Sequence, residues 1–171
     1  MSGGGAATLD DILAREALRD CVRAYARGLD RLDRSLILSA FHPDATFNNG
    51  NIRGTPAEFC DQLLAHQDER LVVQHYLTNS SFEVSGDEAH GETYFHAVIR
   101  YAGTRPYDVM GGRYVDRFER RAGVWGITAR VLLREWHFEA PAPTASTFLA
   151  TTLDRGTRDR HDASYERPLR A

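Results

Sequence analysis

The chain has 171 residues, of which 42% are hydrophobic and 26% charged, as in an ordinary globular protein with one core. Its 21 basic and 24 acidic residues give a formal net charge of −3, which argues against a surface for nucleic acid or an anionic membrane. No apolar run approaches the roughly 18 residues that span a bilayer, and the first residues lack the basic and hydrophobic stretches of a signal peptide. We therefore expect a cytoplasmic protein that acts on a small molecule.

The first third of the chain predicts three helices. Residues 1–8 are rich in glycine and are expected to be disordered, although Thr8 with Asp11 forms a start signal for a first helix that runs to about residue 30. Asp33 can cap a short second helix, which we expect to reach about residue 41 and to be ended by Pro43. Residues 45–47 favour a short strand and residues 48–51 a turn, and Pro56 opens a third helix to about residue 66. Apolar residues recur every three or four positions in the first helix: Leu18, Cys21, Val22, Tyr25, Leu29 and Leu32.

The middle of the chain predicts long strands. Segments 72–85, 88–100, 108–121 and 124–139 are rich in β-branched and aromatic residues, and Gly86 and Gly123 mark hairpin turns between them. Their length exceeds the usual 5–6 residues or so and suits a strongly curved sheet. Residues 141–171 are dominated by proline, threonine, serine and arginine and are expected to form an irregular arm. Helices followed by antiparallel strands predict an α+β domain over residues 9–140, a cone that can hold a small ligand.

Asp30 and His75 are the candidate catalytic residues. Asp30 falls near the C-terminus of its helix, where the helix dipole disfavours a carboxylate by about 0.3–1 kcal/mol, and unlike Asp33 it has no capping task. His75 shares a strand face with apolar neighbours. The two indicate a base in which the carboxylate orients the imidazole. The structural alternatives are a core histidine bonded to a backbone carbonyl, and a surface acid paired with a nearby arginine (Arg27, Arg31 or Arg34).

Other side chains predict less chemistry. Cys21 and Cys60 lie in predicted helices and are expected to be buried free thiols. His96 alternates with Tyr94 and is expected on the outer sheet face. The remaining histidines show no metal-ligand spacing, and no phosphate loop or dinucleotide motif occurs, so neither a metal nor a cofactor is expected.

Four segments carry a resemblance to a known family: residues 25–33 (YARGLDRLD), 41–45 (FHPDA), 74–79 (QHYLTN) and 111–125 (GGRYVDRFERRAGVW), with Arg130 beyond them. They are similar to the SnoaL-like branch of the NTF2-like superfamily, which includes bile-acid 7α-dehydratase, lindane dehydrochlorinase and scytalone dehydratase. The resemblance implies a cone of three N-terminal helices packed on a strongly curved, mostly antiparallel sheet. It also implies cofactor-independent chemistry by the His75–Asp30 pair. The bile-acid enzyme is expected to place a second acid around Ala97, and this sequence has none there.

The resemblance also suggests substrate-binding residues. It implies that Tyr25 and Arg130 are polar partners of the pair, although Tyr25 can equally pack in the core and Arg130 can form an outward salt bridge. Tyr114 shares its strand parity with Met110 and can line the cavity or simply pack. Arg130 is expected to meet Asp30 or a ligand anion.

The sequence thus predicts a cofactor-independent lyase or isomerase acting on a small, largely apolar cyclic substrate. The alternatives are a non-catalytic small-molecule-binding or assembly module, or a cyclase of a biosynthetic pathway. The outer sheet face is expected to carry enough apolar surface to form a homodimer or homotrimer. The residues assigned to that face are Tyr94, His96, Val98, Val115, Trp125, Ile127 and Val131.

Overall fold

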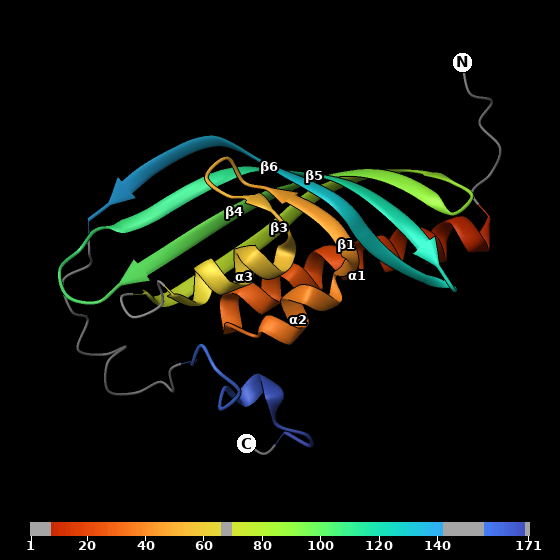
Figure 1. The fold of residues 1–171 in the computed structure, drawn as a ribbon. Coiled ribbons are helices and arrows are strands. Elements are labelled where there is room, and N and C mark those ends of the chain that lie inside the picture. Colours follow the sequence, from red (N-terminus) through yellow and green to blue (C-terminus); the bar gives the residue numbers. More distant parts are fainter. Residues whose placement is uncertain (1–7, 66–69, 142–155, 170–171) are drawn as a thin grey trace.

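The computed structural model describes residues 8–65, 70–141 and 156–169, and its helices lie beneath one face of a curved sheet (Figure 1). The helices are α1 (Leu9–Arg31), α2 (Arg34–Ser39) and α3 (Pro56–Ala65), and a 3₁₀ turn follows at Ala163–Tyr165. The strands are β1 (Phe41–Asn48), β2 (Arg53–Gly54), β3 (Arg70–Ser85), β4 (Glu88–Tyr101), β5 (Tyr107–Arg121) and β6 (Val124–Ala140). None of the helices in the described ranges is long and apolar enough to cross a bilayer.

The sheet is mixed and open. Its strand order is β2-β1-β6-β5-β4-β3, and every neighbouring pair is antiparallel except β1 and β6, which run parallel. The long strands β3 to β6 form a meander whose first and last hairpins turn at the two predicted glycines, while residues 102–106 connect β4 and β5. The predicted α+β cone with a curved, mostly antiparallel sheet is confirmed.

The three predicted helix starts are confirmed, the third being α3 at Pro56. The Thr8 hydroxyl accepts a hydrogen bond from the Asp11 amide at 3.1 Å while the Asp11 carboxylate accepts from the Thr8 amide at 2.9 Å, which forms a capping box for α1. Asp33 Oδ1 accepts from the Leu36 amide at 3.1 Å and caps α2. Because α1 and α2 join through a left-handed residue, Leu32 (φ 54°), the second helix folds back against the first.

Two boundaries around residue 41 were wrong in the sequence prediction. The second helix ends at Ser39 rather than near residue 41, and the following strand begins at Phe41 rather than at residue 45. Pro43 therefore lies inside β1 and does not end the helix. The pairing of β1 with β6 is irregular between Phe41 and Thr46, so the missing N–H of Pro43 costs no ladder hydrogen bond there.

A bulge in β6 corrects part of the predicted outer face. Arg117 pairs with Ala129 and Phe118 with Ile127, which leaves Thr128 as an extra residue on β6. The bulge shifts the alternation of side chains by one position. Ile127 is consequently fully buried in the core and Trp125 is buried with 8% exposure, so neither belongs to the outer face.

Candidate active site

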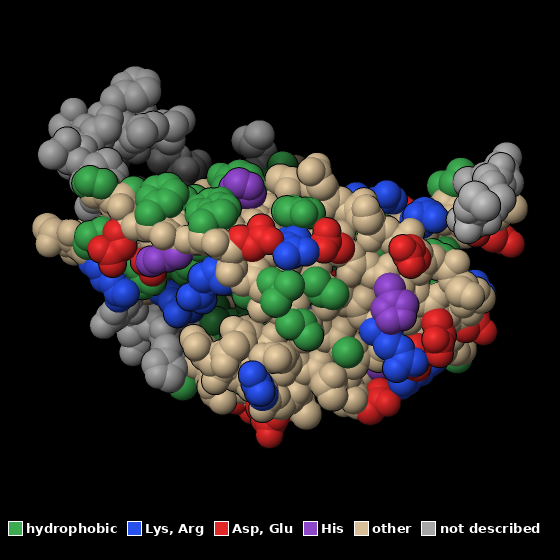
Figure 2. All heavy atoms as spheres, turned by 90° about the horizontal axis from the view of Figure 1, so that it is seen from above, with side chains coloured by type: hydrophobic (Ala, Val, Ile, Leu, Met, Phe, Trp, Pro, Cys, Tyr) green, Lys and Arg blue, Asp and Glu red, His purple; other side chains and the backbone are tan. Residues whose placement is uncertain are grey.

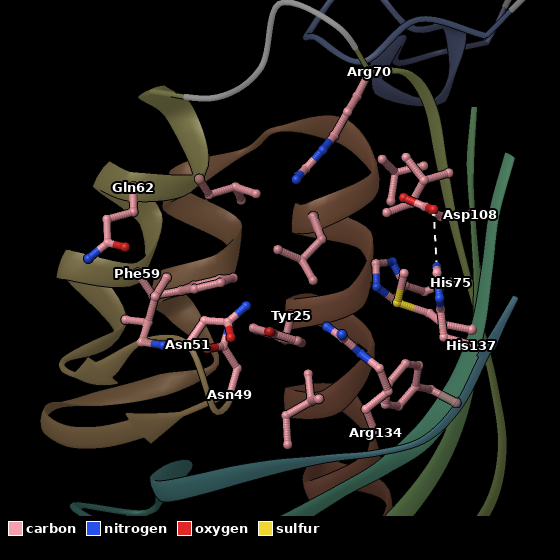
Figure 3. A pocket seen from close by; sticks show the side chains of 18 of the residues that line it. Tyr25, Asn49, Asn51, Phe59, Gln62, Arg70, His75, Asp108, Arg134 and His137 are labelled. Atoms are coloured by element: carbon pink, nitrogen blue, oxygen red, sulfur yellow. Dashed lines mark hydrogen bonds and ion pairs between the residues drawn. The ribbon is translucent and has the colours of Figure 1, made fainter. Parts of the chain in front are cut away.

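A cavity of about 540 Å³ lies between the inner face of the sheet and the helices α1 and α3 (Figure 3). This is a typical volume for a pocket that holds a small organic molecule. Its polar lining comes from several elements, and is described below. Its apolar wall consists of Leu29, Ile52, Phe59, Leu63, Val73, Phe95, Ile99, Met110 and Leu132.

His75 and Asp30 lie in hydrogen-bond contact at one wall of this cavity. The Nδ1 atom of His75 is 2.7 Å from Asp30 Oδ1, and the His75 backbone amide donates to Asp30 Oδ2 at 3.2 Å. Their side chains are only 10% and 18% exposed. A carboxylate on Nδ1 favours the tautomer with the proton on Nδ1, which leaves Nε2 with a free lone pair. The structure therefore brings the two residues together, and their catalytic role stays a prediction.

Asp30 itself lies behind the ring rather than in the cavity. It lines a second, shallower pocket next to α1, and His75 lines both spaces. The three arginines that offered Asp30 an alternative partner have other contacts: Arg27 with Ser164, Arg31 with Asp162 and Arg34 with Asp61. Among the described residues, the side-chain partner of the Asp30 carboxylate is the His75 imidazole, so this carboxylate can orient the ring.

Tyr25 and Tyr114 form the deep aromatic wall of the cavity. Their rings meet edge to face at a centroid distance of 5.4 Å, and Tyr114 stacks on Phe95 at 4.5 Å. Within the described part of the chain, the buried hydroxyl of Tyr114 has no hydrogen-bond partner. Burial raises the pKa of both tyrosines above the usual value of 10, so both hydroxyls stay protonated. The Tyr114 hydroxyl is thus a donor without an acceptor.

Arg130 is fully buried behind these two rings and is not among the residues that line the cavity. Its Nε and Nη2 atoms bind the two carboxylate oxygens of Asp116 at 2.7 and 2.6 Å. The guanidinium carbon lies 4.3 Å from the ring centroids of both Tyr25 and Tyr114. Burial works against its charge, but the Asp116 carboxylate keeps the pKa of Arg130 above its usual value. The structure therefore pairs Arg130 with Asp116 instead of Asp30.

Sequence reasoning missed several polar lining residues. Tyr101 donates to Asp108, whose other oxygen lies 3.1 Å from His137 Nε2 (Figure 3). A second bulge brings His137 into this space: Gly111 pairs with Trp136 and Gly112 with Arg134, so the residue between them is unpaired and the alternation shifts again. The double glycine on β5 was the available signal, since glycine within a strand often marks a bulge or a close approach. The other missed lining residues are Asn49, Asn51, Gln62, Arg70, Arg134 and Arg158.

The described part of the C-terminal segment lies against the end of α1. Arg158 donates to the backbone carbonyls of Leu29 at 2.9 Å and Asp30 at 3.2 Å, which are among those left without a helical partner. The Tyr165 hydroxyl and Arg160 bind the Asp33 carboxylate at 2.9 and 3.0 Å. Residues 156–169 thus fix the helix end that carries Asp30, while residues 142–155 of the expected arm lie outside the described residues.

The two cysteines are buried free thiols, which confirms the prediction. Burial raises the pKa of each thiol to about 11, so neither is a reactive thiolate. In the ranges that the structure describes, no three histidine, cysteine, aspartate or glutamate side chains gather as metal ligands. The predicted outer position of His96 is also confirmed, since it is exposed and its ring meets Trp136 at 5.2 Å.

The structure thus combines an α+β cone with an apolar cavity that has a histidine–carboxylate pair at its wall. The chain belongs to the SnoaL-like domain family, which it matches over residues 10–131. This confirms the SnoaL-like, NTF2-like resemblance seen in the sequence. No curated protein sequence matches the chain.

Solved structures with the same fold include enzymes of elimination chemistry by name. A putative scytalone dehydratase from Novosphingobium aromaticivorans has a TM-score of 0.68 at 19% identity, covering 80% of this chain and 97% of that one. A type 2 hexachlorocyclohexane dehydrochlorinase has a TM-score of 0.71 at 21% identity, covering 81% and 96%. The type 3 dehydrochlorinase from Novosphingobium barchaimii has a TM-score of 0.69 at 21% identity, covering 80% and 99%. At these identities the likeness establishes the fold.

Proposed function

We propose that this protein is a cofactor-independent lyase or isomerase in which His75 is the general base and Asp30 its orienting carboxylate. The observation that carries the proposal is the 2.7 Å contact between Nδ1 and Oδ1, made by a ring that also lines a 540 Å³ cavity. It leaves Nε2 as the basic atom on the cavity side. A positioned base of this kind contributes about 10²–10⁴-fold to rate.

In an elimination, Nε2 takes a proton from a substrate carbon, the C–H electrons form a double bond, and the leaving group departs from the adjacent carbon. The Asp30 carboxylate stabilises the imidazolium that results. In an isomerisation the same proton returns to another carbon. We assign the Tyr114 hydroxyl, which is protonated and without a partner in the described structure, as the donor to a substrate oxygen or leaving group, with Tyr25 beside it.

We place Arg130 one layer behind the substrate as a positioning residue. Because its guanidinium carbon lies 4.3 Å from the centroids of both tyrosine rings and is held by Asp116, it fixes the position of these rings. Its charge is neutralised by Asp116, so we assign it no direct contact with a ligand anion.

The substrate class follows from the wall of the cavity. Nine apolar side chains and two tyrosine rings suit a small cyclic or aromatic molecule. The named chemistry of the structural relatives, dehydration and dehydrochlorination, is consistent with loss of water or chloride from a ring.

A panel of ring compounds tests this proposal. Cyclic β-hydroxyketones report dehydration by the absorbance of the enone, and chlorinated cyclohexanes report elimination by released chloride. Wild type should turn over at least one class, His75→Ala should not, and the exposed His90→Ala, on the neighbouring strand, should match wild type. Turnover that survives in His75→Ala would contradict the assignment of His75 as the base, whereas wild type that binds these compounds without turning any of them over would favour the binding-module alternative.

We further propose that the chain forms a homodimer or homotrimer through the outer face of the sheet. Figure 2 shows hydrophobic side chains gathered on this face around a line of charged groups. Arg113, whose guanidinium carbon lies 5.7 Å from the centroid of the Tyr94 ring, bridges Glu92 and Glu135 at 2.6 Å each. A monomer rarely exposes so many large apolar side chains on one face. They are Tyr94, Val115, Val131, Leu133, Trp136 and Phe138, each 37–53% exposed.

Light scattering tests the assembly. We expect a mass of two or three chains at tens of micromolar, a rough working range for weak self-association. A Phe138→Glu substitution should shift the mass toward one chain, because it places a charge in the apolar face. A wild-type protein that is monomeric under these conditions would contradict the proposal.

A further inference from the structure

The cavity carries an excess of positive charge that the chemistry above does not use. Three arginines line it from three separate segments: Arg70 at the start of β3, Arg134 on β6 and Arg158 on the C-terminal segment. Asp108 is the one carboxylate residue among the described residues that line it. This local excess stands in a chain whose net charge is −3.

The lining carboxylate is already engaged. Asp108 accepts from Tyr101 and contacts His137. Arg158 is committed to the backbone, since it binds the carbonyls of Leu29, Asp30 and Arg70. Asp108 is therefore held by other partners, and Arg158 adds positive charge to the cavity without contributing a counter-charge.

Arg70 and Arg134 stand apart from most arginines of the fold. Within residues 8–65, 70–141 and 156–169, neither has a carboxylate in ion-pair contact, whereas Arg113, Arg121 and Arg130 each hold at least one. Both side chains point into the space between the helices and the sheet (Figure 3), and Arg70 is partly buried there. Arg134 is exposed to solvent, whereas a partly buried guanidinium such as that of Arg70 is ordinarily paired. The sheet supplies two donors with no acceptor from the described protein.

The positive groups also crowd one another. Burial lowers the pKa of Arg158 to about 10, and the charge of Arg70 acts in the same direction. Like charges at one cavity disfavour one another, and an anion bound among them relieves that cost. The arrangement is thus one in which ligand binding supplies the missing counter-charge.

We propose that the ligand of this cavity is a cyclic or aromatic molecule bearing an anionic group, such as a carboxylate or sulfonate, that Arg70 and Arg134 bind. Arginine presents a planar fork of N–H donors that fits such a group, and its long side chain lets both residues converge on it. The ring system then packs on the apolar wall, with the carbon to be deprotonated near Nε2 of His75. This names the substrate class of the proposed active site and rests on that proposal.

Two fluorescent probes of nearly identical shape test the inference. 8-Anilinonaphthalene-1-sulfonate carries one sulfonate, and N-phenyl-1-naphthylamine is the same ring system without it. We expect wild type to bind the sulfonate at least about tenfold more tightly than the neutral probe, the order expected for charge-assisted hydrogen bonds to arginine. Added salt should weaken the binding of the sulfonate probe and leave the binding of the neutral probe unchanged.

Single substitutions identify the residues. Arg70→Gln and Arg134→Gln should each weaken binding of the sulfonate by about fivefold to tenfold, and the double variant by more than either, with the neutral probe within about twofold of wild type. Unchanged binding of the neutral probe also shows that each variant is folded. Arg117→Gln alters the net charge equally on an exposed residue outside the cavity and should leave both probes unaffected. Equal affinity of wild type for the two probes, or sulfonate binding unaffected in both variants, would overturn the inference.

The same titration on His75→Ala separates this inference from the proposed function. A variant that has lost turnover but still prefers the sulfonate supports anion recognition independently of the base. Selective sulfonate binding by wild type without any base activity would refute the catalytic proposal alone. Base activity with no preference between the probes would refute only the anion-binding inference.

Discussion

Replacing Asp116 by asparagine tests whether Arg130 is a structural residue behind the site. The substitution keeps the shape of the side chain but removes the charge that Arg130 binds through two contacts of 2.6 and 2.7 Å. The two side chains are 0% and 1% exposed, so no water can replace the lost carboxylate. A buried charge left without its partner costs about 3–5 kcal/mol. Since a domain is typically stable by about 5–15 kcal/mol, the loss is a large share of the total.

Urea unfolding and thermal melting measure this loss. For a chain of this length, about 1 kcal/mol shifts the melting temperature by roughly 2–4 °C, so a decrease of about 6–20 °C is expected. Asp44→Asn is the matched control, because it also removes a carboxylate that pairs with an arginine in two contacts, but at an exposed site. The control should melt close to wild type. An Asp116→Asn protein that loses less than about 1 kcal/mol would refute this account of Arg130, and a direct ligand contact would then be the better reading.

Three further predictions concern the catalytic pair, the helices and the C-terminal segment. Asp30→Asn should lower the rate on any substrate by about 10²–10⁴-fold, because it changes the tautomer of the His75 ring. The ¹⁵N chemical shifts of His75 report the tautomer, and an unchanged tautomer in the variant would contradict this prediction. Gly28→Ala should lower the melting temperature, although alanine gains about 1 kcal/mol of helix propensity over glycine. The reason is that the new Cβ would lie 2.6 Å from Ile37 Cγ1 and 2.7 Å from the Ile37 backbone nitrogen. A higher melting temperature would refute the close packing of α1 on α2. Burial opposes ionisation of Asp33, but hydrogen bonds from Ser35, Leu36 and Tyr165 with the charge of Arg160 lower its pKa from 3.8 to about 2. The ionised Asp33 therefore contributes fully to stability above about pH 4, and this contribution is lost as the pH falls through about 2. Asparagine caps a helix equally well but carries no charge. In urea titrations the difference in stability between wild type and Asp33→Asn should therefore disappear over this pH range. A gap that persists to pH 2 would contradict the assignment.

Local signals in the sequence were sufficient for most of the fold. The caps at Thr8 and Asp33 and the turns at Gly86 and Gly123 depend on neighbours within a few residues, and the structure places them where the sequence predicted. An acid at the C-terminal end of a helix also marked Asp30 locally, whereas its pairing with His75, 45 residues away, was implied by the family resemblance. These features can be inferred because their physical causes are short in range.

Features that depend on strand register were not predictable in this way. The bulge at Thr128 reversed the expected faces of Trp125 and Ile127, and a second bulge beyond Arg134 turned His137 inward. A single extra residue changes the face of every side chain after it, and alternation alone does not reveal its position. The partner of Arg130 likewise depends on the register that sets Asp116 opposite it.

The most direct test of the central claim is a base-catalysed elimination that needs no knowledge of the natural substrate. 5-Nitrobenzisoxazole is a small aromatic ring that opens to a coloured phenolate when a base removes its one acidic ring proton. We predict that wild type accelerates this opening, that His75→Ala loses about 10²–10⁴-fold of the rate while melting close to wild type, and that His90→Ala retains it. A His75→Ala protein that keeps the wild-type rate would contradict the claim that His75 is the base of this cavity, as would one that fails to fold because the imidazole is a core residue.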